Sequence, residues 1–201
     1  MKVNNFNFIN EYINNLQKTL KSVDQVKLIK CKELILKKVK EKRNIYICGN
    51  GGSSSIANHL LCDFNKGIKY SSKKKILKPR VISFSSNSDL ITAIGNDISY
   101  DKIFSEQIEN FAQKGDLLML FSCSGTSKNI IKAAQLAQKK GLDIVSFTGF
   151  KKSLKLKKFS KIFINLNINN YGIAEDVFQS MMHIISQIIR IESTNKKIKI
   201  L

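Results

Sequence analysis

The chain has 201 residues, enough for one domain with a sizeable core, and it carries a formal net charge of +19. Its lysines are spread over many segments, and no recognition-helix or zinc-finger pattern accompanies them. We therefore interpret the charge as solvated surface and expect no specific nucleic-acid binding; the alternative is a surface that attracts polyanions through charge alone. The four cysteines form no CxxC pair, which excludes a small disulfide framework.

The N-terminus does not predict export. Met1 and Lys2 lead into a polar amphipathic stretch instead of the apolar core of a signal peptide. No apolar run approaches the ~18 residues that a membrane-spanning helix requires. We therefore expect a cytoplasmic protein without a membrane partner.

Apolar residues at helical spacing dominate the first part of the chain. Residues 5–40 predict two helices with a break near Ser22–Asp24, and each helix has a wide apolar face. A small sheet does not need two additional helices before its first strand to cover its faces. We therefore expect the helical pair within residues 1–40 to serve self-association.

Strand and helix patterns alternate in the rest of the chain. The predicted strands are Asn44–Cys48, Arg80–Phe84, Asp116–Phe121, Asp143–Phe147 and Lys161–Leu166. The predicted helices cover residues 53–66, 89–95, 100–113, 129–140 and 173–192. Uniformly apolar strands are typical of a parallel sheet that is covered on both faces. We expect one α/β domain over residues 1–201, a three-layer αβα sandwich whose five-stranded, doubly wound parallel sheet has the order 2-1-3-4-5.

A glycine loop at residues 49–55 follows the first strand and leads into a helix. Its three glycines and three serines bring backbone N–H groups and hydroxyls to the start of that helix, where negative charge is stabilised. This pattern favours a phosphate ligand. The alternative is an ordinary strand–helix turn that needs glycine for its backbone angles.

A serine loop at residues 122–127, Ser-Cys-Ser-Gly-Thr-Ser, follows the third strand. In the expected strand order, the first and third strands are neighbours at the point where ligands of doubly wound sheets bind. The loop lacks the lysine of a nucleotide-binding P-loop. Helix capping by Thr126 or Ser127 explains one of these residues but not all of them. We therefore predict a phosphate cradle.

Four motifs in order resemble those of sugar isomerase (SIS) domains. They are Gly49-Asn50-Gly51-Gly52-Ser53, a predicted turn at Gly95-Asn96-Asp97, Ser122-x-Ser124-Gly125-x-Ser127, and an acid separated by seven residues from a histidine on the last helix. More narrowly, they resemble the phosphoheptose isomerases, which convert sedoheptulose 7-phosphate to an aldoheptose 7-phosphate. The resemblance covers nearly the whole chain.

The resemblance implies a set of substrate-binding residues. Ser122, Ser124 and Ser127 match the phosphate ligands of the family. The full expected set is Asn50, Gly51, Gly52, Ser53, Asn96, Asp97, Ser122, Cys123, Ser124, Ser127 and Glu175.

The resemblance also implies a zinc site, with one ion per subunit. The family's four positions, usually His, Glu, Gln and His, read His59, Asp63, Glu175 and His183 here. Asp63 keeps the carboxylate of the usual glutamate but is shorter by one methylene. Glu175 adds a negative charge, which should strengthen zinc binding.

Ketose–aldose interconversion requires a base beside the carbonyl carbon and an acid for the oxygens, and we assign both roles jointly to Asp63 and His183. The expected function is conversion of D-sedoheptulose 7-phosphate to D-glycero-D-manno-heptose 7-phosphate for heptose-containing surface glycans. The family assembles as homotetramers with sites at subunit interfaces. The alternative is a non-catalytic SIS module, either a sugar-phosphate sensor or an adaptor of the kind that binds a replication initiator.

Overall fold

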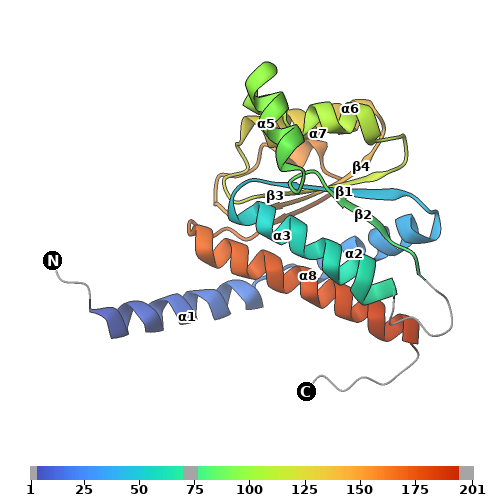
Figure 1. Cartoon of the computed structure of the whole chain (residues 1–201). Helices are drawn as coiled ribbons and strands as arrows, with labels where there is room; N and C mark the ends of the chain where they lie inside the picture. Colours follow the sequence, from blue (N-terminus) through green and yellow to red (C-terminus); the bar gives the residue numbers. More distant parts are fainter. Residues whose placement is uncertain (1–3, 70–76, 195–201) are drawn as a thin grey trace.

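A five-stranded sheet lies between two layers of helices in a computed structural model, which describes residues 4–69 and 77–194 (Figure 1). The strands are β1 (Asn44–Gly49), β2 (Arg80–Ser83), β3 (Leu117–Ser122), β4 (Asp143–Thr148) and β5 (Ile162–Asn165). All neighbours pair in parallel, in the order β2-β1-β3-β4-β5. The predicted fold class and strand order are confirmed.

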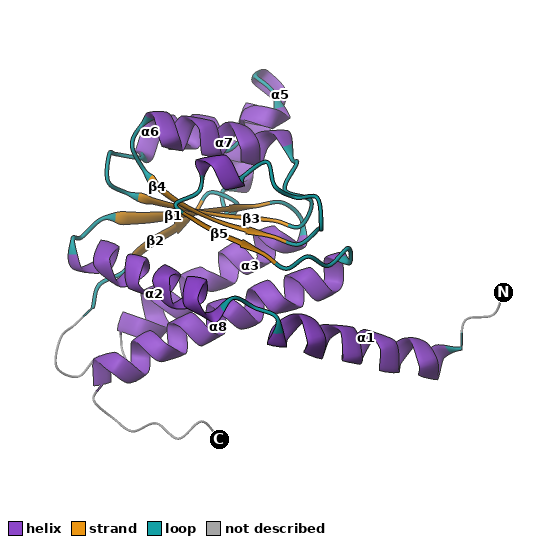
Figure 2. Ribbon diagram, turned by 180° about the vertical axis from the view of Figure 1, so that it is seen from behind, coloured by secondary structure: helices purple, strands orange, loops and turns teal. Residues whose placement is uncertain are grey.

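The two faces of the sheet face separate cores because successive side chains of a strand point to opposite sides. Ile45 and Ile47 of β1 pack into the core under α2 (Gln25–Lys40), α3 (Gly52–Leu61) and α8 (Tyr171–Thr194). Tyr46 and Cys48 pack into the other core, under α5 (Ser88–Asp97), α6 (Ser105–Phe111) and α7 (Lys128–Lys139). Figure 2 shows these two layers on either side of the strands.

β3 is the central strand, and each of its residues is buried. It pairs with β1 up to the end of that strand, where Gly49 lies opposite Phe121. The loops that follow β1 and β3 therefore leave adjacent strands at the same edge of the sheet. This is the position predicted for the ligand site.

Two predicted helices are each divided into two segments in the structure. The helix predicted over residues 53–66 is α3 followed by a π-helical segment, Cys62–Ile68, in which Asp63 lies. The helix predicted over residues 100–113 is a short 3₁₀ turn, Tyr100–Lys102, followed by α6.

The turn predicted at Gly95-Asn96-Asp97 is wrong, because these residues form the last turn of α5. The side chain of Asn87 caps the start of α5 by accepting a hydrogen bond from Leu90 N at 3.0 Å. Ile94 is buried in the core on that side of the sheet. Capping and packing thus outweigh the unfavourable helix propensity of the glycine.

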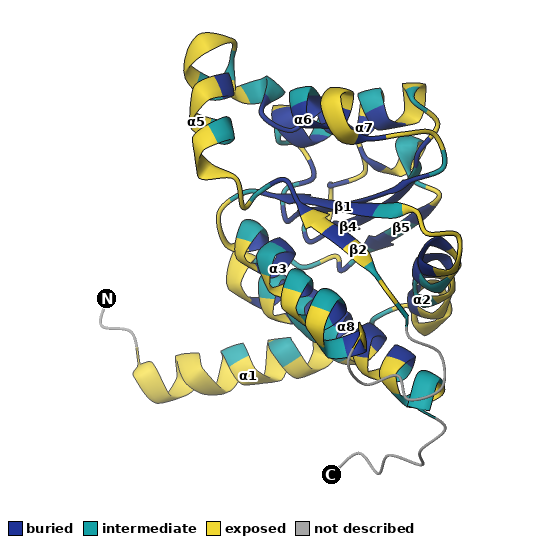
Figure 3. Cartoon of the chain, turned by 45° about the vertical axis from the view of Figure 1, so that its right-hand side comes forward, coloured by how far each residue is buried: buried dark blue, intermediate teal, exposed yellow. Residues whose placement is uncertain are grey.

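α1 (Asn5–Lys21) projects from the body of the protein, and most of it is exposed (Figures 1 and 3). The predicted break between the first two helices is confirmed: α2 begins after Asp24, which caps it by accepting from Lys27 N at 3.0 Å. α1 is fastened to α8 by Tyr12, whose hydroxyl donates to Asp176 Oδ2 at 2.8 Å. Within the described ranges, the helices are too short or too polar for one to cross a membrane.

Candidate functional site

A cavity of about 340 Å³ lies between the glycine loop, the serine loop and the start of α8. It is lined by residues of both loops together with one strand residue and two residues of α8: Asn50, Gly51, Gly52, Ser53, Phe121, Ser122, Cys123, Ser124, Ser127, Tyr171 and Glu175. The structure thus brings together the predicted substrate-binding residues except Asn96 and Asp97.

The glycine loop is held by close backbone contacts and by hydrogen bonds from its neighbours. A Cβ atom on Gly49 would lie 2.3 Å from the carbonyl oxygen of Ser53, so glycine is required for α3 to begin where it does. Ser85 Oγ donates to Gly49 O at 2.8 Å and accepts from Gly49 N at 3.0 Å. The Asn50 and Asn129 side chains exchange two hydrogen bonds, of 2.9 and 3.0 Å, which tie the glycine loop to α7.

The serine loop presents hydroxyl groups at the N-terminus of α7. Ser122 Oγ accepts from Gly125 N at 3.1 Å, and Ser124 Oγ accepts from Thr126 N at 3.3 Å, which leaves each hydroxyl proton free to donate to a ligand. Ser127 is the N-cap residue of α7, but its side chain makes no capping bond within the described part of the chain. Hydroxyl donors at a helix N-terminus are suited to an anion such as phosphate.

Cys123 belongs to the serine loop, and its buried thiol lies 3.9 Å from Ser53 Oγ of the glycine loop. Burial raises the pKa of its thiol to about 12, and the nearby Glu175 carboxylate adds to the increase. Because the thiol stays neutral, it adds no negative charge beside the serine hydroxyls.

This environment predicts a selective pattern of thiol modification. At about pH 8, close to the pKa of an ordinary thiol, iodoacetamide should alkylate the exposed Cys62 and leave Cys123 unmodified, because only a thiolate reacts readily. Mass spectrometry of the native protein measures the extent of alkylation at each cysteine. The control variant Cys62→Ser should carry no label at position 62. Labelling of Cys123 as fast as that of Cys62 would show that the thiol is not held neutral.

Glu175 faces the glycine loop across the cavity. Ser53 Oγ donates to Glu175 Oε1 at 3.2 Å. A Cβ atom on Gly52 would lie 2.1 Å from Glu175 Oε2, so the carboxylate sits directly against the backbone of α3. α3 and α8 are therefore in contact at their N-terminal ends.

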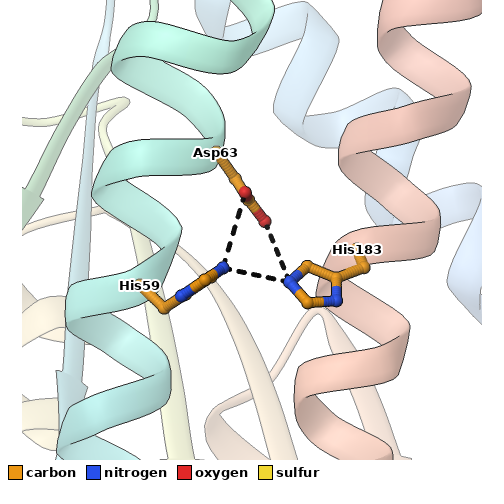
Figure 4. A group of neighbouring side chains, drawn as sticks. All are labelled: His59, Asp63 and His183. Atoms are coloured by element: carbon orange, nitrogen blue, oxygen red, sulfur yellow. Dashed lines mark hydrogen bonds and ion pairs between the residues drawn. The ribbon is translucent and has the colours of Figure 1, made fainter.

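A second group, the His–Asp–His cluster (His59, Asp63 and His183), lies further along the same two helices (Figure 4). His59 and Asp63 are four residues apart on one face of α3 and its π-helical continuation, and His183 comes from α8. The two Nε2 atoms are 3.0 Å apart. Each is also 3.6 Å from a carboxylate oxygen of Asp63.

The cluster has the composition and spacing of a metal site. The ligand atoms of a tetrahedral zinc ion, with bonds of about 2.0–2.1 Å, lie about 3.3 Å from one another. The three separations in the cluster, 3.0, 3.6 and 3.6 Å, bracket that value. Asp63 Oδ2 is buried and has no hydrogen-bond partner among the described residues, as expected of an atom that is aimed at a cation. These residues fit Zn²⁺.

The chain also matches a family model described as the SIS domain, over residues 8–149. The match covers well over half of the chain. The chain belongs to the SIS domain family.

Several proteins similar to this chain carry one name. The phosphoheptose isomerase of Helicobacter hepaticus is 32% identical over 163 residues, which are 81% of this chain and 81% of that protein. The phosphoheptose isomerase of Campylobacter concisus is 36% identical over 117 residues, which are 58% of this chain and 60% of that protein. The structure of phosphoheptose isomerase GmhA from Neisseria gonorrhoeae superposes with a TM-score of 0.79 at 24% identity, covering 90% of this chain and 94% of that chain, and shows the same fold.

Some of the residues expected from the SIS resemblance lie apart from the others within a single chain. Glu175 is not part of the His–Asp–His cluster, because it precedes His183 by eight residues, about two turns or roughly 12 Å along α8. Asn96 and Asp97 do not line the cavity: they are exposed on α5, on the opposite side of the sheet from α3 and α8, and hydrogen-bond to each other at 2.8 Å.

The same helical spacing separates the His–Asp–His cluster from the cavity. Gly52 contacts Glu175 at the cavity, and His59 contacts His183 seven and eight residues later on the respective helices. α3 and α8 thus run side by side in the same direction. They present the cavity and the cluster roughly 11 Å apart.

Three residues of the SIS site were not predicted. Tyr171 lines the cavity, Asn129 fixes Asn50, and the Gln179 side chain lies 2.8 Å from His183 Nε2. Gln179 could have been found from the sequence, because it precedes His183 by four residues on a predicted helix. The contact between Asn50 and Asn129 depends on tertiary structure and leaves no local signal.

Proposed function

We propose that this chain is a phosphoheptose isomerase, an aldose–ketose isomerase that converts D-sedoheptulose 7-phosphate to D-glycero-D-manno-heptose 7-phosphate. The observation that carries the proposal is that α3 and α8 run along both the cavity, whose wall holds the serine-loop phosphate cradle, and the His–Asp–His cluster. The names of the relatives support the same activity. Such a product suits the synthesis of heptose-containing surface glycans.

The cradle supplies binding energy at the phosphate end of the substrate. Ser122, Ser124 and Ser127 offer hydroxyl donors, and the N-terminus of α7 adds its positive dipole. The net charge of +19 raises the local concentration of anionic substrates at low ionic strength. The neutral Cys123 thiol keeps the wall beside the phosphate free of a further repelling charge.

The cluster supplies the acid and the base. A base removes the proton from C1 of the ketose, and an acid delivers a proton to C2, while O1 loses a proton and O2 gains one. The carboxylate of Asp63 and the imidazole of His183 are 3.6 Å apart, and histidine can donate or accept a proton near neutral pH. We assign the proton transfers jointly to these two residues.

A zinc ion fits the same cluster. His59, Asp63 and His183 would hold it through two imidazole nitrogens and a carboxylate oxygen. When bound, it would polarise the carbonyl and hydroxyl oxygens between which the proton moves.

We further propose that the protein forms a homotetramer with its sites at subunit interfaces. Within one chain, the cavity and the cluster are roughly 11 Å apart along the helices, so a second copy that brings its own cluster to the cavity would complete a single site. α1 carries exposed apolar side chains that a neighbouring copy could cover: Phe6, Phe8, Ile9 and Ile13. A groove of about 260 Å³ with apolar walls from α1, α2 and α8 lies nearby.

The oligomer proposal predicts a change of assembly when charge is placed on the apolar face of α1. The double variant Ile9→Glu/Ile13→Glu should run as a smaller species in size-exclusion chromatography with light scattering, because burying a carboxylate in an apolar interface is costly. Asn10→Glu/Asn14→Glu is the matched control, since it adds the same charge at the same spacing on exposed positions. Equal masses for the parent and both variants would contradict the use of this face in assembly.

The function is tested by incubating the protein with sedoheptulose 7-phosphate and following aldose formation. Loss of turnover in His183→Ala supports an isomerase. A raised KM for sedoheptulose 7-phosphate in Ser124→Ala supports the proposed phosphate cradle. Tight binding of the sugar phosphate without turnover would favour the non-catalytic SIS sensor or adaptor. The proposal places the protein in the cytoplasm, where free thiols such as its four cysteines persist.

A further inference from the structure

We propose that Ser153 is a positioning residue of the phosphate cradle, which holds the serine loop so that the backbone N–H group of Ser124 faces the phosphate. Ser153 lies in the β4–β5 connection (residues 149–161) and does not itself line the cavity. The proposal rests on the function proposed above, because it names a further residue that serves binding of the same substrate. Phosphate binding can nevertheless be measured without turnover.

The hydroxyl group of Ser153 is buried against the backbone of the serine loop. Ser153 is 1% exposed. Its Oγ donates to Ser124 O at 2.6 Å and also lies within hydrogen-bond distance of Cys123 O, at 3.1 Å, so one proton serves two carbonyl groups. The side chain therefore fastens the serine loop to the β4–β5 connection.

The carbonyl group of Cys123 is held by three donors from this connection. Gly149 N and Phe150 N donate to its oxygen at 3.0 and 2.9 Å, and Ser153 Oγ is the third donor. The N–H group of Ser124 belongs to the same peptide unit. Because the C=O and N–H groups of a trans peptide point in opposite directions, this N–H group points away from the β4–β5 connection.

The N–H group of Ser124 has no acceptor within the described part of the chain. Ser124 lines the cavity, and its Oγ accepts from Thr126 N, which leaves the hydroxyl proton free. An unpaired backbone N–H group at the wall of a cavity is a donor that a ligand oxygen can use. Ser124 thus offers two donors to a phosphate, one from its backbone and one from its side chain.

The next peptide unit, between Ser124 and Gly125, is held at both ends. Its carbonyl oxygen accepts from Ser153, and its N–H group donates to Ser122 O at 3.0 Å and to Ser122 Oγ at 3.1 Å. Gly125 has a φ of 60°, and a Cβ atom there would lie 2.8 Å from Ser153 Cβ, so the turn packs directly on Ser153. Removing the Ser153 hydroxyl should therefore loosen the cradle and leave the His–Asp–His cluster unchanged.

Ser153→Ala tests the proposal, with inorganic phosphate and sedoheptulose 7-phosphate as the probes. Calorimetric titration in about 0.15 M salt, which screens exposed lysines, measures the Kd for phosphate. We expect this Kd and the KM for the sugar phosphate each to rise about 3–10-fold, the usual net contribution of one hydrogen bond, with kcat within about twofold of the parent. Ser124→Ala should also raise the phosphate Kd, which identifies the titrated site as the cradle.

Ser160→Ala is the matched control. Its Oγ donates to Leu156 O at 2.8 Å in the same connection but does not contact the serine loop, so both constants should match those of the parent. Four results would each overturn the proposal: an unchanged phosphate Kd in Ser153→Ala, an equal rise in Ser160→Ala, a fall in kcat as large as the rise in KM, or no binding of phosphate at the cradle of the parent. A raised phosphate Kd in Ser153→Ala, with no turnover by the parent, would support the role of Ser153 and contradict the isomerase function. Turnover by the parent with an unchanged KM in Ser153→Ala would do the reverse.

Discussion

Replacing Asp63 with asparagine is expected to lower turnover of sedoheptulose 7-phosphate by about 10²–10⁴-fold, the usual contribution of a positioned acid–base group. Asparagine has nearly the same shape, so the cluster should keep its packing while losing the carboxylate that faces both histidines. Steady-state kinetics of the purified variant measure the change. The unfolding midpoint should shift little, because the variant alters charge and not volume.

Two further variants sharpen this prediction. Asp63→Glu restores the carboxylate with one more methylene and should be far more active than Asp63→Asn. Asp89→Asn removes an exposed carboxylate on α5 and should leave turnover unchanged. Turnover of Asp63→Asn within about twofold of the parent would remove Asp63 from the acid–base machinery, since a positioned acid or base contributes far more.

Replacing Gly49 with alanine is expected to have the largest effect on stability. The added Cβ would lie 2.3 Å from the carbonyl oxygen of Ser53 and 2.5 Å from its carbonyl carbon. Both atoms belong to the backbone of the first turn of α3, so no side-chain rotation can relieve the clash. We expect a loss of at least about 2 kcal/mol in the free energy of unfolding, or about 4–8 °C in Tm.

Gly95→Ala is the matched control for that experiment. The nearest atoms to its added Cβ are side-chain carbons of Tyr100 and Ile103, at 3.9 and 4.0 Å, which are ordinary contacts. Because alanine favours the helix, this variant should be as stable as the parent or more stable. Thermal unfolding followed by circular dichroism compares the two. An unchanged midpoint in Gly49→Ala would show that the turn does not need the close approach.

The sheet and its ligand edge were predictable because each rests on a local pattern. The apolar strands alternate with helices, and right-handed crossovers then restrict the strand order. The order places the ends of β1 and β3 side by side, which is why the glycine and serine loops were expected to meet and do so.

The error at Gly95 arose because a motif was interpreted without its geometry. Gly95 was taken as a turn signal, although the cap at Asn87 and the buried Ile94 continue the helix. Glu175 and His183 lie about two helical turns apart, so within one chain the expected ligand set does not meet. The pairing of Asn50 with Asn129 joins residues from different elements and required the folded structure.

The most direct measurement of the central claim is NMR of the reaction in D₂O. If Asp63 and His183 move a proton between C1 and C2 of a ketose phosphate, aldoheptose 7-phosphate should accumulate from sedoheptulose 7-phosphate with deuterium at C2. Asp63→Asn should form it far more slowly. A protein that binds the sugar phosphate but yields neither aldose nor deuterated ketose would contradict the account and leave it as a binding module.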